Sequence, residues 1–393
     1  MNMNNKNWVS VWGNAVSIAE HHPEAYAKYI TLRYPVYIPF AGDTLRFTFD
    51  NYCGSEAVTV TRATVSAATS PVYEKMPLAC PCKKETICDI TFSKNESVTM
   101  EAHQTAVSDP VSFPVKKGMT LTVSLYFADF TLMQSAVLVT GPLSKGFFSL
   151  GDQTHANALP MDTTKTTNWF YFLSNIELMT AEENHTVICY GDSITAGAWP
   201  DYLTLLARQN PDNHTAFIRR ATSGSRVLRQ YECITYDSYG LKGTNRFPHE
   251  IPTTGADTVI IQQGINDIIH PVGIETNPFR PMSDLPTAKE LIDGYRYYIE
   301  EAKKLHLKVY MGTLLPIFGW RTYATFRDDL RNELNAWIRS AKEIDGCIDF
   351  DLALRGSENP SAFREGFDSG DHLHPSSKAY QAMAECAYEV LQR

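Results

Sequence analysis

The sequence lacks several features that define large classes of protein. No segment approaches the roughly 18 consecutive apolar residues of a membrane-spanning helix. Basic residues are in deficit, because 35 Lys and Arg face 44 Asp and Glu and give a formal net charge of −9. Nucleic acids and anionic membranes bind clustered basic side chains, whereas the basic residues here are scattered. The sequence therefore predicts no nucleic acid partner and no membrane partner.

Residues 1–10 also lack the basic segment followed by an apolar segment that marks a secretory signal. We therefore expect a cytoplasmic protein, with secretion as the alternative if a signal peptide has been removed.

Metal-binding and phosphate-binding patterns are missing as well. Three of the eight cysteines cluster, Cys80, Cys82 and Cys88, but their C-x-C-x5-C spacing lacks the paired C-x2-C or H-x3-H words of a zinc site. We interpret the cysteines as reduced thiols. Since no glycine-rich phosphate loop is found either, the sequence predicts neither a metal nor a cofactor.

The first half of the chain has the pattern of short strands. Apolar and polar residues alternate, for example at 45–49, 58–61 and 121–127, and turn-forming pairs such as Lys117-Gly118 separate the runs. This pattern predicts an antiparallel β-sandwich, jelly-roll-like, over residues 1–182.

The second half alternates apolar strands with amphipathic helices. The strand-like runs are 187–190, 216–218, 258–262, 308–314 and 347–350. The clearest helical patterns are 287–305, 325–342 and 376–391. Such alternation predicts an α/β domain, a parallel sheet covered by helices on both faces, over residues 183–393.

Chemically distinctive segments follow three of the predicted strands. They are Gly191-Asp192-Ser193, Thr222-Ser223-Gly224-Ser225 and Gly264-Ile265-Asn266-Asp267. Reactive groups gather at the carboxyl ends of strands in open α/β sheets. A fourth segment, Asp371-His372-Leu373-His374, precedes the last helix and can return to the same edge. Together they supply the serine, histidine and acid of one nucleophilic site.

Each candidate also has an ordinary structural interpretation. Ser193 can be a helix cap, and Asp371 and His374 can be polar loop residues. Gly224 and Asn266 are both favoured in turns. Acyl transfer, however, needs donors for the charge that develops on the carbonyl oxygen. The backbone N–H groups of Ser193 and Gly224 and the side-chain amide of Asn266 can supply them.

In order and spacing, the four segments resemble the sequence blocks of the SGNH or GDSL hydrolase family, named after its Ser, Gly, Asn and His. Residues 191–197 match the G-D-S block. The G-x-N-D motif at residues 264–267 and the D-x-x-H motif at residues 371–374 match the third and fourth blocks. The start Trp8-Val9-Ser10-Val11-Trp12 extends the similarity to a bacterial subgroup with an N-terminal β-rich domain.

The resemblance implies a flavodoxin-like, three-layer α/β/α catalytic domain without a cofactor. It also implies Ser193 as nucleophile, His374 as general base and then acid, and Asp371 as the carboxylate that orients His374. The oxyanion hole would comprise the N–H groups of Ser193 and Gly224 and the Asn266 amide.

Neighbouring residues have weaker interpretations. Asp192 is expected to hold the turn, and His372 to be a structural or rim residue. Arg226 either braces its loop through an ion pair or clamps a substrate group. Four aromatic residues either pack in the core or line an acyl or sugar site: Trp199, Phe318, Trp320 and Tyr323.

The leading hypothesis is a serine esterase that removes short acyl groups, above all acetyl, from a small-molecule or oligosaccharide ester. An arylesterase, lipase or thioesterase for longer acyl chains is the alternative. Residues 1–182 have two further interpretations, a carbohydrate-binding module or an oligomerisation module. The second would make the protein a homo-oligomer.

Overall fold

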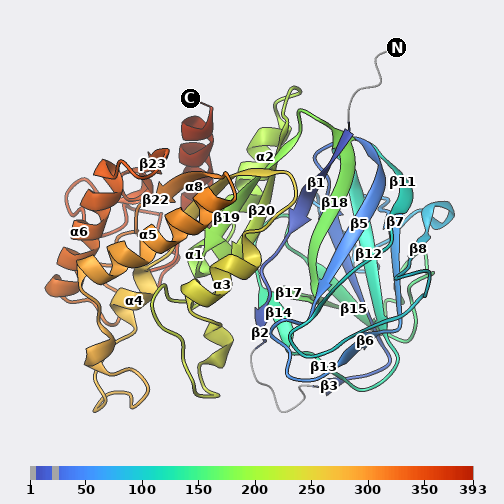
Figure 1. Ribbon diagram of the computed structural model, residues 1–393, viewed down its shortest axis with the longest axis horizontal. Helices are drawn as coiled ribbons and strands as arrows, with labels where there is room; N and C mark the ends of the chain where they lie inside the picture. The colour runs from blue at the N-terminus through green and yellow to red at the C-terminus, as the bar shows by residue number, and fades with distance from the viewer. Residues whose placement is uncertain (1–5, 20–25, 393) are drawn as a thin grey trace. The chain divides into compact units, whose positions relative to one another are not determined.

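The computed structural model describes residues 6–19 and 26–392, coloured along the chain in Figure 1. It divides into an N-terminal unit, Met1–Thr186 with Pro211–Ile218, and a C-terminal unit, Val187–Asn210 with Arg219–Arg393. The expected boundary after residue 182 lies four residues before the first division. Within the described ranges, no helix has the length and apolar character needed to cross a bilayer.

Antiparallel strands build the N-terminal unit, as the alternating pattern predicts. One sheet has the order β1 (Lys6–Gly13), β18 (Leu173–Ala181), β5 (Gly42–Asp50) and β10 (Thr105–Val107), with β11 (Val111–Val115) also paired to β5. The other has the order β16 (Lys165–Thr167), β15 (Gly146–Leu150), β4 (Ile30–Tyr37), β12 (Thr120–Phe127), β7 (Arg62–Ala67) and β8 (Cys88–Ile90). Smaller sheets join β13 (Thr131–Leu132) to β3 (Tyr26–Ala27), β6 (Val58–Val60) to β9 (Val98–Met100), and β17 (Trp169–Tyr171) to β14 (Ser135–Leu138) and β2 (Ser17–Ile18).

Strand β5 shows why the period-two pattern forms this sheet. Leu45, Phe47 and Phe49 are fully buried on one face. Between them Arg46 points the other way and donates from Nε to Glu177 of β18, its partner in register, at 2.5 Å. The expected antiparallel β-rich architecture is confirmed.

The C-terminal unit is organised around a parallel sheet. Its strand order is β20 (Thr215–Ala221), β19 (His185–Gly191), β21 (Ala256–Gln262), β22 (Lys308–Gly312) and β23 (Gly346–Ile348). In chain order this reads 2-1-3-4-5, the flavodoxin-like arrangement. The predicted doubly wound α/β fold is confirmed.

Helices occupy the connections of this sheet (Figure 1). They are α1 (Ser193–Ala196), α2 (Trp199–Arg208), α3 (Gly243–Glu250), α4 (Ile265–Ile269), α5 (Ala288–Lys304), α6 (Thr325–Ser340), α7 (Phe350–Leu354) and α8 (Ser377–Leu391). Helices α5 and α8 start one residue later than predicted, because Thr287 and Ser376 are their N-caps. The expectation of strand at residue 350 is wrong, since Phe350 begins α7 behind the capping side chain of Asp349.

The strand order reverses between β19 and β21, the point where open α/β sheets bind ligands. Ser193 follows β19 and Asn266 follows β21. The topology thus carries the first and third sequence blocks to neighbouring strand ends.

Candidate active site

Ser193 is the first residue of α1, directly after β19. Asp192 caps this short helix, because its Oδ1 accepts a hydrogen bond from the Ile194 N–H at 3.0 Å. Gly191 lets the turn pass close to β21, where a Cβ would lie only 2.3 Å from the carbonyl oxygen of Gln262. The Ser193 Oγ lies 2.8 Å from Nε2 of His374, so these two residues, 181 positions apart in the sequence, meet in the fold.

Asp371 holds His374 from the opposite side. Its Oδ2 lies 2.6 Å from the ring Nδ1, and its Oδ1 accepts the backbone N–H groups of Leu373 and His374 at 3.0 and 2.8 Å. A carboxylate at Nδ1 favours the tautomer with a proton there, which leaves Nε2 free to accept the serine proton. Burial opposes ionisation of Asp371, but the hydrogen bonds from His374 outweigh it and lower the pKa of Asp371 to about 2.

Gly224 turns its loop in the left-handed region, with φ of +77°. A Cβ at this position would lie 2.3 Å from ring atoms of Tyr239. Within the described residues, the backbone N–H groups of Ser193 and Gly224 donate to no other group. Asn266 gives one amide hydrogen to the Ser225 carbonyl at 3.1 Å and keeps a second one available. These are uncommitted donors of the kind an oxyanion needs.

Arg246 of α3 joins the first two blocks, a role the sequence analysis missed. Its fully buried guanidinium donates to the Gly191 carbonyl at 2.8 Å and to the Ser225 Oγ at 2.8 Å. Glu250, four residues later, lies 3.1 Å away and balances the charge. An Arg–Glu pair at helical i,i+4 spacing was the signal in the sequence, but it did not indicate which backbone groups the arginine would bind.

Asp267 joins the second block to the third. Its two oxygens accept the N–H groups of Val227 and Leu228 at 2.8 and 3.0 Å. Burial raises the pKa of Asp267 to about 6, although these hydrogen bonds act in the opposite direction. Arg226 follows the bracing interpretation, because its guanidinium lies 3.1 Å from Asp284.

His372 lies outside the serine–histidine contact. Its Nδ1 lies 2.6 Å from Oδ2 of Asp368, whose Oδ1 accepts the N–H groups of Gly370 and His372 at 2.8 and 2.9 Å. The chain therefore carries two aspartate–histidine pairs in tandem, of which only the Asp371–His374 pair meets Ser193.

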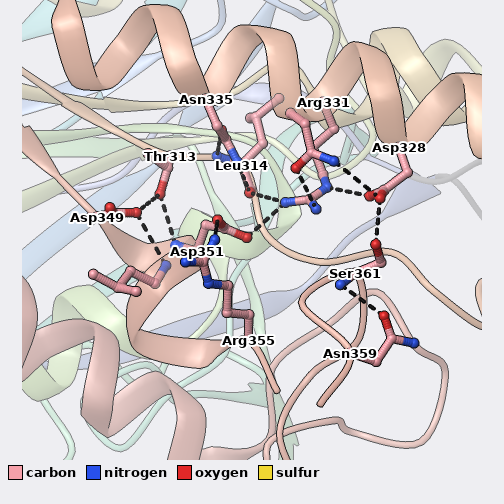
Figure 2. A network of polar contacts seen from close by, with 12 residues as sticks. Thr313, Leu314, Asp328, Arg331, Asn335, Asp349, Asp351, Arg355, Asn359 and Ser361 are labelled. Atoms are coloured by element: carbon pink, nitrogen blue, oxygen red, sulfur yellow. Dashed lines mark hydrogen bonds and ion pairs between the residues drawn. The ribbon is translucent and has the colours of Figure 1, made fainter. Parts of the chain in front are cut away.

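A buried polar network braces the loops after β22 and α7 (Figure 2). Arg331 of α6 donates to Asp328 and to Asp351, both at 2.7 Å, and to the Leu314 carbonyl at 3.2 Å. Ser361 donates to Asp328 at 2.5 Å. The network ties α6 to the segment that leads toward Asp371 and His374.

The aromatic candidates separate into two groups. Trp199 is fully buried and stacks at a tilt on Phe350, with ring centroids 5.6 Å apart, so its core interpretation holds. Phe318 is 47% exposed and meets Tyr323 edge to face at 5.1 Å. Of these two, Phe318 presents an aromatic surface to solvent and Trp199 does not. Across the described part of the chain, no cluster of three or more His, Cys, Asp or Glu side chains is placed to hold a metal ion.

A doubly wound α/β unit whose serine, histidine and aspartate meet at strand ends has the arrangement of hydrolases that use a serine nucleophile. Residues 189–382 match the model of the GDSL-like lipase/acylhydrolase family. This part of the chain belongs to that family of ester-hydrolysing enzymes, which confirms the resemblance read from the four blocks. The individual roles of the five candidate residues stay predictions.

Solved structures of similar proteins include two from different bacteria. A GDSL-like lipase from Bacteroides thetaiotaomicron is 20% identical, with 54% of this chain and 89% of that chain covered and a TM-score of 0.39. A catalytic mutant of an acetylxylan esterase from Geobacillus stearothermophilus is 17% identical, with 52% and 93% covered and a TM-score of 0.39. None of the curated proteins compared with the chain matches it.

Proposed function

We propose that the protein is a serine esterase that removes short acyl groups, above all acetyl, from a carbohydrate alcohol. The observation that carries this proposal is the continuous pair of contacts from Ser193 Oγ to His374 Nε2 at 2.8 Å and from His374 Nδ1 to Asp371 Oδ2 at 2.6 Å. Both are within the range in which a proton can be transferred directly.

In the first step, Ser193 Oγ attacks the ester carbonyl carbon while its proton passes to Nε2 of His374. Asp371 stabilises the imidazolium that forms. The negative charge on the carbonyl oxygen is received by the N–H groups of Ser193 and Gly224 and by the free amide hydrogen of Asn266.

The tetrahedral intermediate then collapses. His374 gives its proton to the leaving alcohol oxygen, and the acyl group stays on Ser193 as an ester. Water then attacks the carbonyl carbon of this acyl-enzyme while His374 again acts as base. The carboxylic acid is released and the Ser193 hydroxyl is regenerated.

Support for a short acyl group comes from the packing around the proposed oxyanion donors. The ring of Tyr239 fills the space beside Gly224, since a Cβ there would lie 2.3 Å from its ring atoms. A small acyl pocket loses transition-state binding when it is overfilled.

The test is hydrolysis of nitrophenyl acetate by wild type and by Ser193→Ala. Loss of the nucleophile should lower kcat by at least about 10⁴-fold while the circular dichroism spectrum is unchanged. Ser340→Ala, on the surface of α6, is the matched control and should hydrolyse the ester at the wild-type rate. Full activity of Ser193→Ala would refute the assignment.

A series of nitrophenyl esters of increasing acyl length tests the acetyl preference. We expect kcat/KM to fall beyond about four carbons, since one extra methylene changes binding by about 1–3 kcal/mol when the pocket cannot accept it. A rate that rises with chain length would favour a lipase or thioesterase instead.

A further inference from the structure

Two loops of the C-terminal unit line an open pocket of about 710 Å³. One loop follows β20 and contributes Tyr231 and Glu232, and the other follows α4 and contributes Phe279 and Asp284. Figure 1 shows both loops at the edge of the sheet where α1 and α4 begin. The pocket is thus on the side of the sheet that carries the reactive segments.

The pocket begins beside the proposed oxyanion glycine. Arg226 lines it and comes two residues after Gly224, so the two Cα atoms are at most about 7.6 Å apart. The ring of Tyr239, which lies against Gly224, also meets the ring of Tyr231 in the pocket wall, with centroids 5.7 Å apart. The pocket therefore lies next to the loop that carries Gly224.

The charges in the wall nearly cancel. Arg226 and Arg229 both pair with Asp284, at 3.1 and 3.4 Å. Lys242 and Glu232 add one charge of each sign. A phosphate-rich ligand needs a larger surplus of cationic donors than the single positive charge that this wall has in excess. A long acyl chain would cover the charged groups of Glu232 and Lys242 without hydrogen-bonding to them, so neither fits.

A neutral, hydroxyl-rich ligand does fit. The side-chain amides of Gln230 and Asn245 and the charged groups offer both donors and acceptors for hydroxyls. Phe279, 47% exposed, provides a flat apolar surface that suits the apolar face of a sugar ring. We infer that this pocket is the subsite for the sugar residues of an acylated oligosaccharide, an inference that rests on the proposed esterase function.

The experiment compares kcat/KM for acetylated xylotetraose with kcat/KM for nitrophenyl acetate, which carries no sugar residue. Asn245 is exposed on α3, so Asn245→Trp fills the pocket from the helix surface. We expect the ratio of the two constants to fall at least tenfold, mainly through a higher KM for the tetrasaccharide. Phe279→Ala should lower the ratio about three- to tenfold through loss of the aromatic contact.

The matched control is Phe326→Ala, because Phe326 is 49% exposed on α6 and does not line the pocket. Its ratio should equal that of wild type. Ratios within twofold of wild type for both pocket variants would overturn the inference, as would failure of the wild-type enzyme to deacetylate the tetrasaccharide while it cleaves nitrophenyl acetate. In either case Ser193-dependent cleavage of nitrophenyl acetate would leave the proposed catalytic function standing, whereas Ser193-independent cleavage would refute that function itself.

Discussion

Asp371 contacts His374 at two points, the ring Nδ1 at 2.6 Å and the backbone N–H at 2.8 Å. The same carboxylate therefore fixes the position of the histidine backbone and the orientation of its ring. Two contacts from one side chain leave the imidazole little freedom to turn away from Ser193.

Replacing Asp371 should disable the base without unfolding the loop. Asp371→Asn favours the wrong imidazole tautomer, and we expect kcat for nitrophenyl acetate to fall by about 10³–10⁴-fold with little change in KM. The tandem pair provides the control, because Asp368 holds His372 at the same 2.6 Å without meeting Ser193. Asp368→Asn should lose less than about tenfold, and equal losses in the two variants would argue against the assigned roles.

Asn266→Ala tests the oxyanion hole. Loss of one such donor typically lowers kcat by about 10²–10³-fold, and we expect this with KM almost unchanged, because the donor acts on charge that develops in the transition state. The thermal unfolding midpoint should be measured alongside, since Asn266 also donates to the Ser225 carbonyl. A loss of activity below about threefold in a folded variant would exclude Asn266 from the oxyanion hole.

The Arg331 network makes a prediction about stability. Arg331→Met removes the buried guanidinium that joins the carboxylates of Asp328 and Asp351, and removal of one member of a buried ion pair typically destabilises a protein by about 3–5 kcal/mol. Arg296→Met removes an exposed arginine paired with Asp293 and Glu343 and should change the free energy of unfolding by less than about 1 kcal/mol. Urea denaturation of both variants measures the difference, and comparable losses would contradict the structural role of the network.

Asp192 makes stability depend on pH. Complete burial, opposed by the hydrogen bond from Ile194, raises the pKa of Asp192 to about 7, whereas an unfolded Asp has a pKa of about 3.9. Between about pH 4 and pH 7 the folded state keeps a proton that the unfolded state has released. Rising pH therefore favours unfolding over this window, and the contribution levels off above pH 7.

Asp192→Asn removes this titration, so its urea midpoint should change less between pH 5 and pH 8 than that of wild type. Asp329→Asn, at an exposed position of α6, should follow wild type. An unaltered pH dependence in Asp192→Asn would show that another group is responsible.

Local patterns in the sequence were enough to predict the strands of the parallel sheet and the helices α5, α6 and α8, and they also selected the five candidate residues. Ser193 and His374 lie in short sequence motifs whose residue types indicate their chemistry. The strands and helices were predictable because burial of one face produces a period of two in a strand and of 3.6 in a helix. The helices α1, α4 and α7 have only four or five residues, too few for a period to appear.

Long-range polar contacts escaped prediction for a different reason. Arg246 binds backbone groups that lie 26 and 55 residues away in the sequence, and Arg331 reaches Asp351 across 20 residues. Nothing in the neighbouring sequence specifies such partners, because an arginine on an amphipathic helix most often faces solvent. Only the fold reveals which arginines are enclosed.

The hydrogen bond between Ser193 and His374 spans 181 residues. Contacts between such distant positions carry a large loop-closure entropy and depend on the elements between them being in place. Helices such as α5 and α6 can form from neighbouring residues alone, but the reactive pair cannot. Ester hydrolysis therefore requires the completely folded C-terminal unit. An activity assay consequently also measures folding, because a partly folded chain does not bring Ser193 and His374 together.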